Sequence, residues 1–109
     1  MAEIRAGLSR PEATIAPKYF YDDLGSKLFE AITQLPEYYP TRTERSIFER
    51  YAADIARSVG SGATMIDLGA GNCAKARQLF PALRPAHYVA VDVSADFLRD
   101  AMHELRSQF

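Results

Sequence analysis

The chain has 109 residues and a formal net charge of −1, which leaves room for one small domain and gives no basic excess to meet nucleic-acid phosphates or an anionic membrane. A hydrophobic content of 48% is ordinary for a globular protein, and no apolar run reaches the roughly 20 residues of a membrane-spanning helix. The single cysteine fits a reducing compartment, and with the two histidines it gives no metal-ligand spacing. We therefore expect a cytoplasmic protein with no nucleic-acid, membrane or metal partner.

The first 40 residues predict an irregular arm followed by a short helix. Residues 1–17 contain one glycine and two prolines among scattered small residues, which predicts an irregular or loosely docked N-terminal arm. After an aromatic and acidic cluster, Ser26 is a candidate N-cap for an amphipathic helix over residues 27–35. Pro36 is expected to end this helix, because the residue before a proline is pushed out of the helical region.

The best-marked helix follows a loop that holds two tyrosines between two prolines, residues 36–40. Thr41 and Glu44 predict a capping box, in which each side chain accepts a hydrogen bond from the other residue's backbone N–H. Apolar residues then follow one helical face as far as Val59, and Gly60 is the expected C-terminal stop.

The second half of the chain predicts strands and helices in alternation. Residues 64–67 are a short, mostly apolar run that ends in an acid, which is typical of a buried strand; a glycine loop and a helix follow, and Pro81 should end or kink that helix. Residues 87–92 predict a second strand, again ending in an acid. Ser94 is a candidate N-cap for a last amphipathic helix, which runs to about Gln108.

This order predicts an α/β fold in which a helical lead-in precedes a β-α-β-α unit. Two near-continuous apolar strands joined by a crossover helix indicate a parallel strand pair with a right-handed crossover. A doubly wound nucleotide fold needs more β-α units than this sequence contains. We therefore expect residues 61–109 to be the first part of an incomplete Rossmann-like domain. The N-terminal arm and a helical segment over residues 18–60 precede it, and we expect this helical segment to cover any cofactor and substrate that the domain binds.

The segment Gly69–Ala74 matches the pattern G-x-G-x-x-G/A of dinucleotide sites. That pattern alone fits a tight turn without a ligand equally well. Two acids add weight: Asp67 ends the strand before Gly69 and Gly71, and Asp92 ends the next strand, the position from which an acid binds ribose hydroxyls. Together they predict a site for a ribose-containing cofactor.

Charge favours S-adenosylmethionine (SAM) over a dinucleotide. A pyrophosphate needs a helix N-terminus without a crowding acid, whereas the sulfonium and ammonium of SAM favour a carboxylate such as that of Asp67. Lys75 is placed to meet the carboxylate of SAM, although a solvated surface lysine fits its spacing slightly better. Cys73 fits a small packing residue better than a nucleophile, because no partner base is visible.

Tyrosines supply the candidates for substrate recognition. The proline-held loop fixes the rings of Tyr38 and Tyr39, and rigid exposed hydroxyls suit recognition of a small polar substrate. The cluster at residues 19–21 fits core aromatics better than site residues.

Two segments carry a resemblance to a known family. The sequence K-Y-F-Y-D-D-L-G-S-K-L-F-E-A-I-T-Q-L-P-E-Y-Y-P-T-R-T-E (18–44), followed by D-L-G-A-G-N-C-A-K (67–75), resembles the SAM-dependent histidine-specific Nα-methyltransferases, whose best-known members form hercynine in ergothioneine biosynthesis. The resemblance covers about residues 17–106, and L-P-E-Y-Y-P-T-R-T-E is far more specific than the glycine loop.

The resemblance implies a class I SAM-dependent methyltransferase fold and roles for individual residues. Gly69, Lys75 and Asp92 fall on SAM-binding positions, with Asp92 on the ribose. Tyr38 matches a tyrosine that contacts the substrate histidine, and Tyr21 lies in an aromatic motif that closes over the methionine end of the cofactor. The family often has a Ser/Thr-rich loop where this chain has residues 72–74, and Ser94 replaces a common acid. No residue is assigned as a catalytic base.

Two functions follow as expectations. The first is the N-terminal portion of a SAM-dependent methyltransferase that acts on the α-amino group of L-histidine or a related amino acid, with the 109-residue chain alone not expected to turn over. The second is a non-catalytic module that self-associates or binds a partner through its open strand edge. An NAD-dependent oxidoreductase is a third and less favoured alternative.

Overall fold

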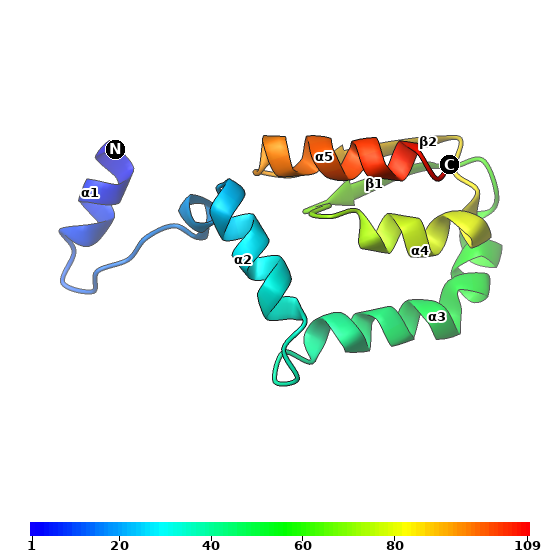
Figure 1. Ribbon diagram of the computed structural model, residues 1–109, viewed down its shortest axis with the longest axis horizontal. Coiled ribbons are helices and arrows are strands. Elements are labelled where there is room, and N and C mark those ends of the chain that lie inside the picture. Colours follow the sequence, from blue (N-terminus) through cyan, green and yellow to red (C-terminus); the bar gives the residue numbers. More distant parts are fainter.

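A computed structural model describes all residues 1–109 and shows helices leading into one β-α-β-α unit (Figure 1). The elements, in chain order, are α1 (Ala2–Leu8), a 3₁₀ turn η1 (Pro17–Phe20), α2 (Asp23–Thr33), α3 (Pro40–Val59), β1 (Thr64–Leu68), α4 (Ala74–Leu83), β2 (His87–Val91) and α5 (Ala95–Arg106). This mixed architecture confirms the predicted fold class. None of the helices is both long and apolar enough to cross a membrane.

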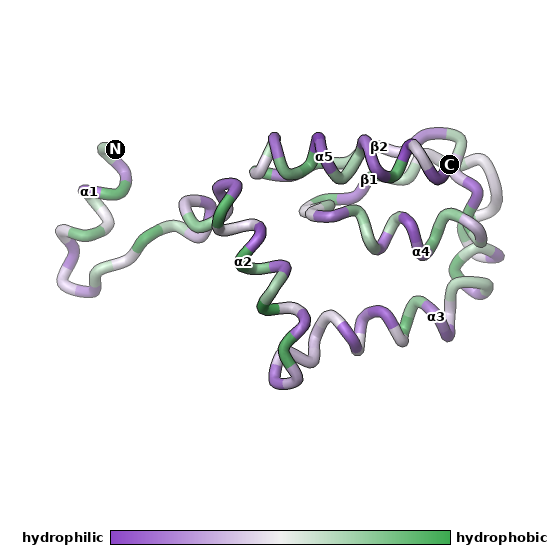
Figure 2. Tube along the Cα trace, in the orientation of Figure 1, coloured by the Kyte–Doolittle hydropathy of each residue, from purple (hydrophilic) through white to green (hydrophobic).

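The two strands form the predicted parallel pair, in register from Thr64 opposite His87 to Leu68 opposite Val91. Helix α4 is the crossover between the strands, and α4 and α5 cover the same face of the sheet. The core lies on that face, where the alternation of side chains along each strand turns every second residue toward the helices. Its buried members are Ala70, Cys73, Ala76, Ala101 and Leu105, with Met65, Phe80, Tyr88, Ala90, Leu98 and Met102 packed around them. Figure 2 shows polar and apolar residues alternating along the turns of α5, as expected of an amphipathic helix.

The opposite face of the sheet is uncovered. It carries the intervening residues of both strands, and the side chains of Ile66 and Leu68 are 62% and 74% exposed. Val89 and Val91 lie beside them on β2 and are also exposed. Four adjacent aliphatic side chains without a covering layer form a continuous apolar surface.

Helix α2 begins earlier than its sequence predicts. Its N-cap is Asp22, whose Oδ1 accepts a hydrogen bond from the backbone N–H of Gly25 at 2.8 Å, so the prediction that Ser26 caps the helix is wrong. Ser26 instead lies inside the helix and is buried. Gly25 permits the earlier start because the chain folds back closely at this point: a Cβ there would lie 1.7 Å from the carbonyl oxygen of Phe20.

Helix α3 also begins without its predicted cap. Pro40 is the first helical residue, where its fixed φ is already suited to a helix, and no side chain caps the helix, so the predicted Thr41–Glu44 capping box is absent. The guanidinium of Arg42 secures the preceding loop instead, donating to the carbonyl oxygens of Leu35, Pro36 and Tyr38. At its other end α3 stops at Gly60, as predicted, with φ at 80°.

Two further segments differ from expectation. Residues 2–8 form helix α1 where irregular backbone is predicted, although none of its residues is buried. Glu3 ties this helix to η1, because its carboxylate accepts from Lys18 Nζ at 2.7 Å and from the Tyr19 hydroxyl at 2.8 Å; the ion pair with Lys18 lowers the pKa of Glu3. Pro81 lies inside the last turn of α4 rather than ending it; Ala82 and Leu83 follow before Arg84 closes the helix in the left-handed region.

Candidate functional site

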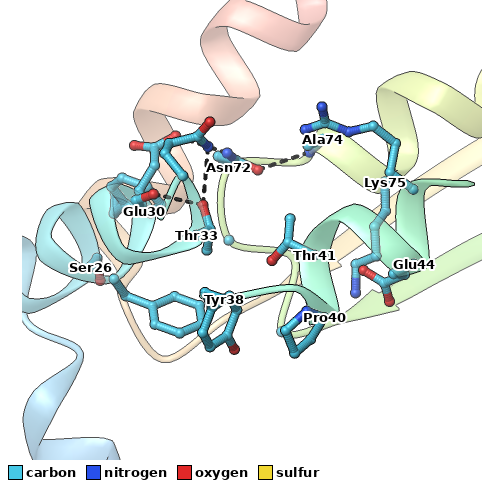
Figure 3. Close-up of a pocket in the computed structure, with 16 residues that line it drawn as sticks. Ser26, Glu30, Thr33, Tyr38, Pro40, Thr41, Glu44, Asn72, Ala74 and Lys75 are labelled. Atoms are coloured by element: carbon cyan, nitrogen blue, oxygen red, sulfur yellow. Dashed lines mark hydrogen bonds between the residues drawn. The ribbon is translucent and has the colours of Figure 1, made fainter. Parts of the chain in front are cut away.

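A cleft lies over the glycine loop, between α2 with its following loop and the carboxyl ends of the two strands. It consists of two adjoining cavities of about 450 Å³ and 410 Å³. The cavities share the lining residues Ser26, Phe29, Gly69, Gly71 and Phe97, so they form one continuous groove. The first cavity continues toward Tyr38 and Lys75 (Figure 3), and the second toward Asp92.

The floor of the cleft is bare backbone. Gly69 and Gly71 have φ values of 73° and 53°, in the left-handed region that favours glycine, and no atom lies within 4 Å of the place where a Cβ would stand on either. The loop is fixed to the second strand, because the N–H groups of Gly69 and Ala70 both donate to the carbonyl oxygen of Val91, at 2.8 and 3.1 Å. A ligand can therefore approach a rigid backbone closely at this point.

Asp92 closes one end of the cleft. Its Oδ2 accepts from the N–H of Gly71 and its Oδ1 from the N–H of Ser94, each at 2.9 Å. A carboxylate oxygen has more than one lone pair, so both oxygens keep the capacity to accept a hydroxyl from a ligand. The acid is thus held in one orientation by the glycine loop itself.

Lys75 lines the other end of the cleft, and Asp67 lies beneath it. The Lys75 Nζ is 3.6 Å from Asp67 Oδ1, and the side chain of Lys75 is 35% exposed. Asp67 is buried and accepts a hydrogen bond from the Tyr88 hydroxyl at 3.1 Å. Burial raises the pKa of Tyr88, so that hydroxyl remains a donor. Asp67 lines neither cavity, and its contacts inside the protein are with Tyr88 and Lys75.

Cys73 is fully buried behind the loop, with its Sγ 3.9 Å from the Sδ of Met102. Burial is the main cause that raises the pKa of its thiol, so the thiolate form is disfavoured. A buried thiol without a paired base fills space in the core and does not serve as a nucleophile.

Aromatic rings form the wall opposite the glycine loop. Phe29 packs edge-on against Tyr21 and against Tyr38, with ring centroids 5.8 Å apart in each pair. Tyr38 lines the first cavity and Tyr21 the second, so the structure brings these two predicted site residues together across one ring. Tyr39, its neighbour on the same loop, is 67% exposed and lines neither cavity.

The polar side of α2 supplies cleft residues that are not among those predicted from the sequence. Ser26, Glu30 and Thr33 all line the first cavity (Figure 3). Glu30 Oε1 accepts a hydrogen bond from the side-chain amide of Asn72 at 2.8 Å, which joins α2 to the glycine loop. The signal was present in the sequence, since polar residues at positions 26, 30 and 33 share one helical face, opposite the apolar residues by which the helix is recognised.

The residues of the cleft can bind a ligand and hold it in one orientation, but they include no nucleophile paired with a base. Asp92 stands at one end of an open backbone groove, and Lys75 and Glu30 line its other part. No group of three or more His, Cys, Asp or Glu side chains is placed to hold a metal ion. These features fit an organic ligand that has hydroxyls at one end and charges of both signs at the other.

A family and three relatives that this chain resembles are described as histidine methyltransferases or as an ergothioneine biosynthesis protein. The sequence profile of a family described as "Histidine-specific methyltransferase, SAM-dependent" matches residues 1–109. The histidine N-alpha-methyltransferase of Mycolicibacterium smegmatis is 44% identical over 103 residues, which cover 91% of this chain and 32% of the relative. The enzyme of the same name from Mycobacterium tuberculosis is 41% identical over 100 residues, covering 88% and 31%.

A third relative, ergothioneine biosynthesis protein 1 of Neurospora crassa, is 38% identical over 91 residues, which cover 80% of this chain and 10% of the relative. The chain thus spans about a third of the length of the two mycobacterial relatives and a tenth of the Neurospora one.

Proposed function

The chain belongs to the family of SAM-dependent, histidine-specific methyltransferases, and we propose that it is the N-terminal, cofactor-binding portion of an enzyme that methylates the α-amino group of L-histidine or a related amino acid. SAM is the cofactor of this family. The observation that carries the proposal is the continuous cleft over the glycine loop, with Asp92 at one end and Lys75 and Tyr38 at the other.

The residues around the cleft fit SAM. The open space over Gly69 and Gly71 admits a ligand close to the backbone, and the carboxylate of Asp92 is oriented to accept the ribose hydroxyls. The ammonium of Lys75 complements the carboxylate of the methionine portion. Tyr21, packed on Phe29, covers the groove from above. When bound, SAM supplies a methyl group carried on a sulfonium.

Tyr38 orients the amino-acid substrate against the cofactor cleft. Its ring is held edge-on by Phe29, and its loop by the guanidinium of Arg42. Methyl transfer to an amine depends mainly on aligning the nitrogen lone pair with the methyl carbon, so a rigid substrate contact contributes directly to the rate. We assign no catalytic base to this chain. The names of the mycobacterial and Neurospora relatives support L-histidine as the substrate and ergothioneine biosynthesis as the pathway. The buried, unpaired Cys73 fits a cytoplasmic location.

A calorimetric titration of the chain with SAM tests the proposal. We expect saturable one-to-one binding with submillimolar affinity, and weaker binding of NADH, because a pyrophosphate would lie against the acids of the cleft. Replacing Lys75 by methionine keeps an unbranched side chain of similar length and removes its charge, and should weaken binding roughly 10-fold by the loss of one charge-assisted contact. Absent binding, or tighter binding of NADH, would contradict the cofactor assignment.

The uncovered sheet face favours a second candidate, a non-catalytic module that self-associates. Ile66, Leu68, Val89 and Val91 present adjacent aliphatic side chains to solvent, and the strands beside them have free edges. Sedimentation over a range of concentrations would then show a dimer. Val89→Lys should shift the dimer to monomer, because a charge would be buried, whereas Ala53→Lys on the exposed side of α3 should not. A monomer at every concentration would rule this candidate out.

A further inference from the structure

The methionine end of SAM carries three charges, and the cleft must meet all of them. The carboxylate is negative, while the ammonium and the sulfonium are positive. Asp67 is the acid that the sequence points to for the positive charges, yet its carboxylate is 7% exposed and is already engaged by Tyr88 and Lys75. It lines neither cavity. The positive charges of the ligand therefore need another partner.

Two acids line the first cavity, Glu30 and Glu44, and only Glu30 is held in position. Its Oε1 accepts from Asn72 Nδ2 at 2.8 Å, and the amide of Asn72 is itself oriented, because its Oδ1 accepts the N–H of Ala74 at 3.1 Å. Glu44 has no such partner, and it also lines the neighbouring hollow between α3 and α4. The oriented acid is the one that stands beside the glycine loop (Figure 3).

The other carboxylate oxygen of Glu30, Oε2, accepts no hydrogen bond from the protein. Glu30 and Lys75 thus line the same cavity as opposite charges, together with Glu44 and Arg45 from α3, and of these four only Glu30 and Lys75 stand on elements that adjoin the glycine loop through Asn72 and Ala74. A zwitterionic α-amino acid group has the matching pair of charges, and each would meet its complement only in one orientation.

We infer that Glu30 is the residue that binds the ammonium of the cofactor's methionine portion, and that Asn72 holds it ready to do so. This inference rests on the proposed function, since it names the contact that the same cleft makes with SAM. Glu30 closes the cleft from α2, while Lys75 binds the carboxylate from α4. Recognition of the amino-acid end is therefore shared between the helical lead-in and the β-α-β-α unit.

The test compares two ligands that share the adenosine half. Methylthioadenosine has the ribose that meets Asp92 but carries none of the three charges, because it lacks the ammonium and the carboxylate and its sulfur is an uncharged thioether. By calorimetry, Glu30→Gln should weaken SAM binding about 10- to 100-fold, the loss of a charge-assisted hydrogen bond, and leave methylthioadenosine binding and the melting temperature of the free chain unchanged. Glu37→Gln, on the exposed loop outside the cavities, is the matched control and should change neither affinity.

Decarboxylated SAM separates the two charges. Decarboxylated SAM keeps the ammonium, so Glu30→Gln should weaken its binding as much as the binding of SAM. Lys75→Met should weaken the binding of SAM alone. Asn72→Ser, whose side chain is too short to reach Glu30, should weaken SAM binding about 5-fold, because the Glu30 carboxylate remains but is no longer held in position.

Equal weakening of SAM and methylthioadenosine by Glu30→Gln would mean that Glu30 only shapes the cleft, and an unchanged SAM affinity would remove it from the site; either result overturns the inference. Failure of the unaltered chain to bind SAM would instead overturn the proposed function, and the inference with it.

Discussion

The affinity of the chain for SAM should fall about 10- to 150-fold when Asp92 is replaced by alanine. The carboxylate is placed to accept the ribose hydroxyls, and a hydrogen bond to a charged group is worth about 1.5–3 kcal/mol. The same side chain accepts the N–H of Gly71 and the N–H of Ser94, so alanine also releases the glycine loop from the end of β2. Calorimetric titration with SAM measures the loss.

Asp96→Ala is the matched control for this prediction. Asp96 lies in the first turn of α5, exposed, and pairs only with Arg99 on its own helix, so its removal should leave SAM affinity within about 2-fold. The SAM affinity of Asp92→Asn should lie between those of Asp92→Ala and Asp96→Ala, since an amide oxygen still accepts one hydrogen bond but carries no charge. An Asp92→Ala chain that binds SAM as tightly as the unaltered chain would exclude Asp92 from the site.

The second large effect is expected from Gly25→Ala. A Cβ at this position would lie 1.7 Å from the carbonyl oxygen of Phe20, and because that atom belongs to the backbone, the start of α2 must move away from η1. Overpacking of this kind costs about 1–3 kcal/mol. The displacement would carry Tyr21 with it and open the aromatic wall of the cleft. We expect faster amide hydrogen exchange in α2 together with weaker SAM binding.

Lys27→Ala in the same helix provides the comparison for Gly25→Ala. Lys27 is exposed and pairs with Asp23 at i,i+4, and solvent screens such a surface ion pair, so the pair contributes little to stability. Alanine there should leave both the exchange rates of α2 and the SAM affinity nearly unchanged. A Gly25→Ala chain with the same exchange rates as the unaltered chain would show that the contact with Phe20 relaxes without cost.

The elements of the fold are largely predictable because their signals are local. The apolar period, the stop at Gly60 and the strand pattern at residues 64–68 and 87–91 each depend on neighbours within a turn or two. The errors arose where two local signals competed. Asp22 caps α2 in place of Ser26, which lies a full helical turn later, and Pro40 begins α3 directly before Thr41, so in both helices the earlier signal starts the helix.

The site is only partly predictable, because its contacts join residues far apart in sequence. The direction of the Asp67 side chain depends on Tyr88 from the neighbouring strand, and no local pattern shows which acid at a strand end is buried by its neighbour. The bond between Asn72 and Glu30 joins residues 42 positions apart. Each of these residues is visible in the sequence, but its partner is set only by the fold.

The length of α3 has a mechanical consequence for the cleft. The helix carries the Tyr38 loop at its N-terminal end and enters β1 at the other, and its 20 residues make an arm of about 30 Å. A 5° tilt about the β1 end would swing the tyrosine by roughly 2–3 Å, about the length of a hydrogen bond. Two amides near the far end oppose that swing: Gln78 Nε2 donates to the Arg45 carbonyl at 2.9 Å, and Asn72 reaches α2. These two hydrogen bonds therefore limit how far the N-terminal end of α3 can move, and with it the width of the cleft.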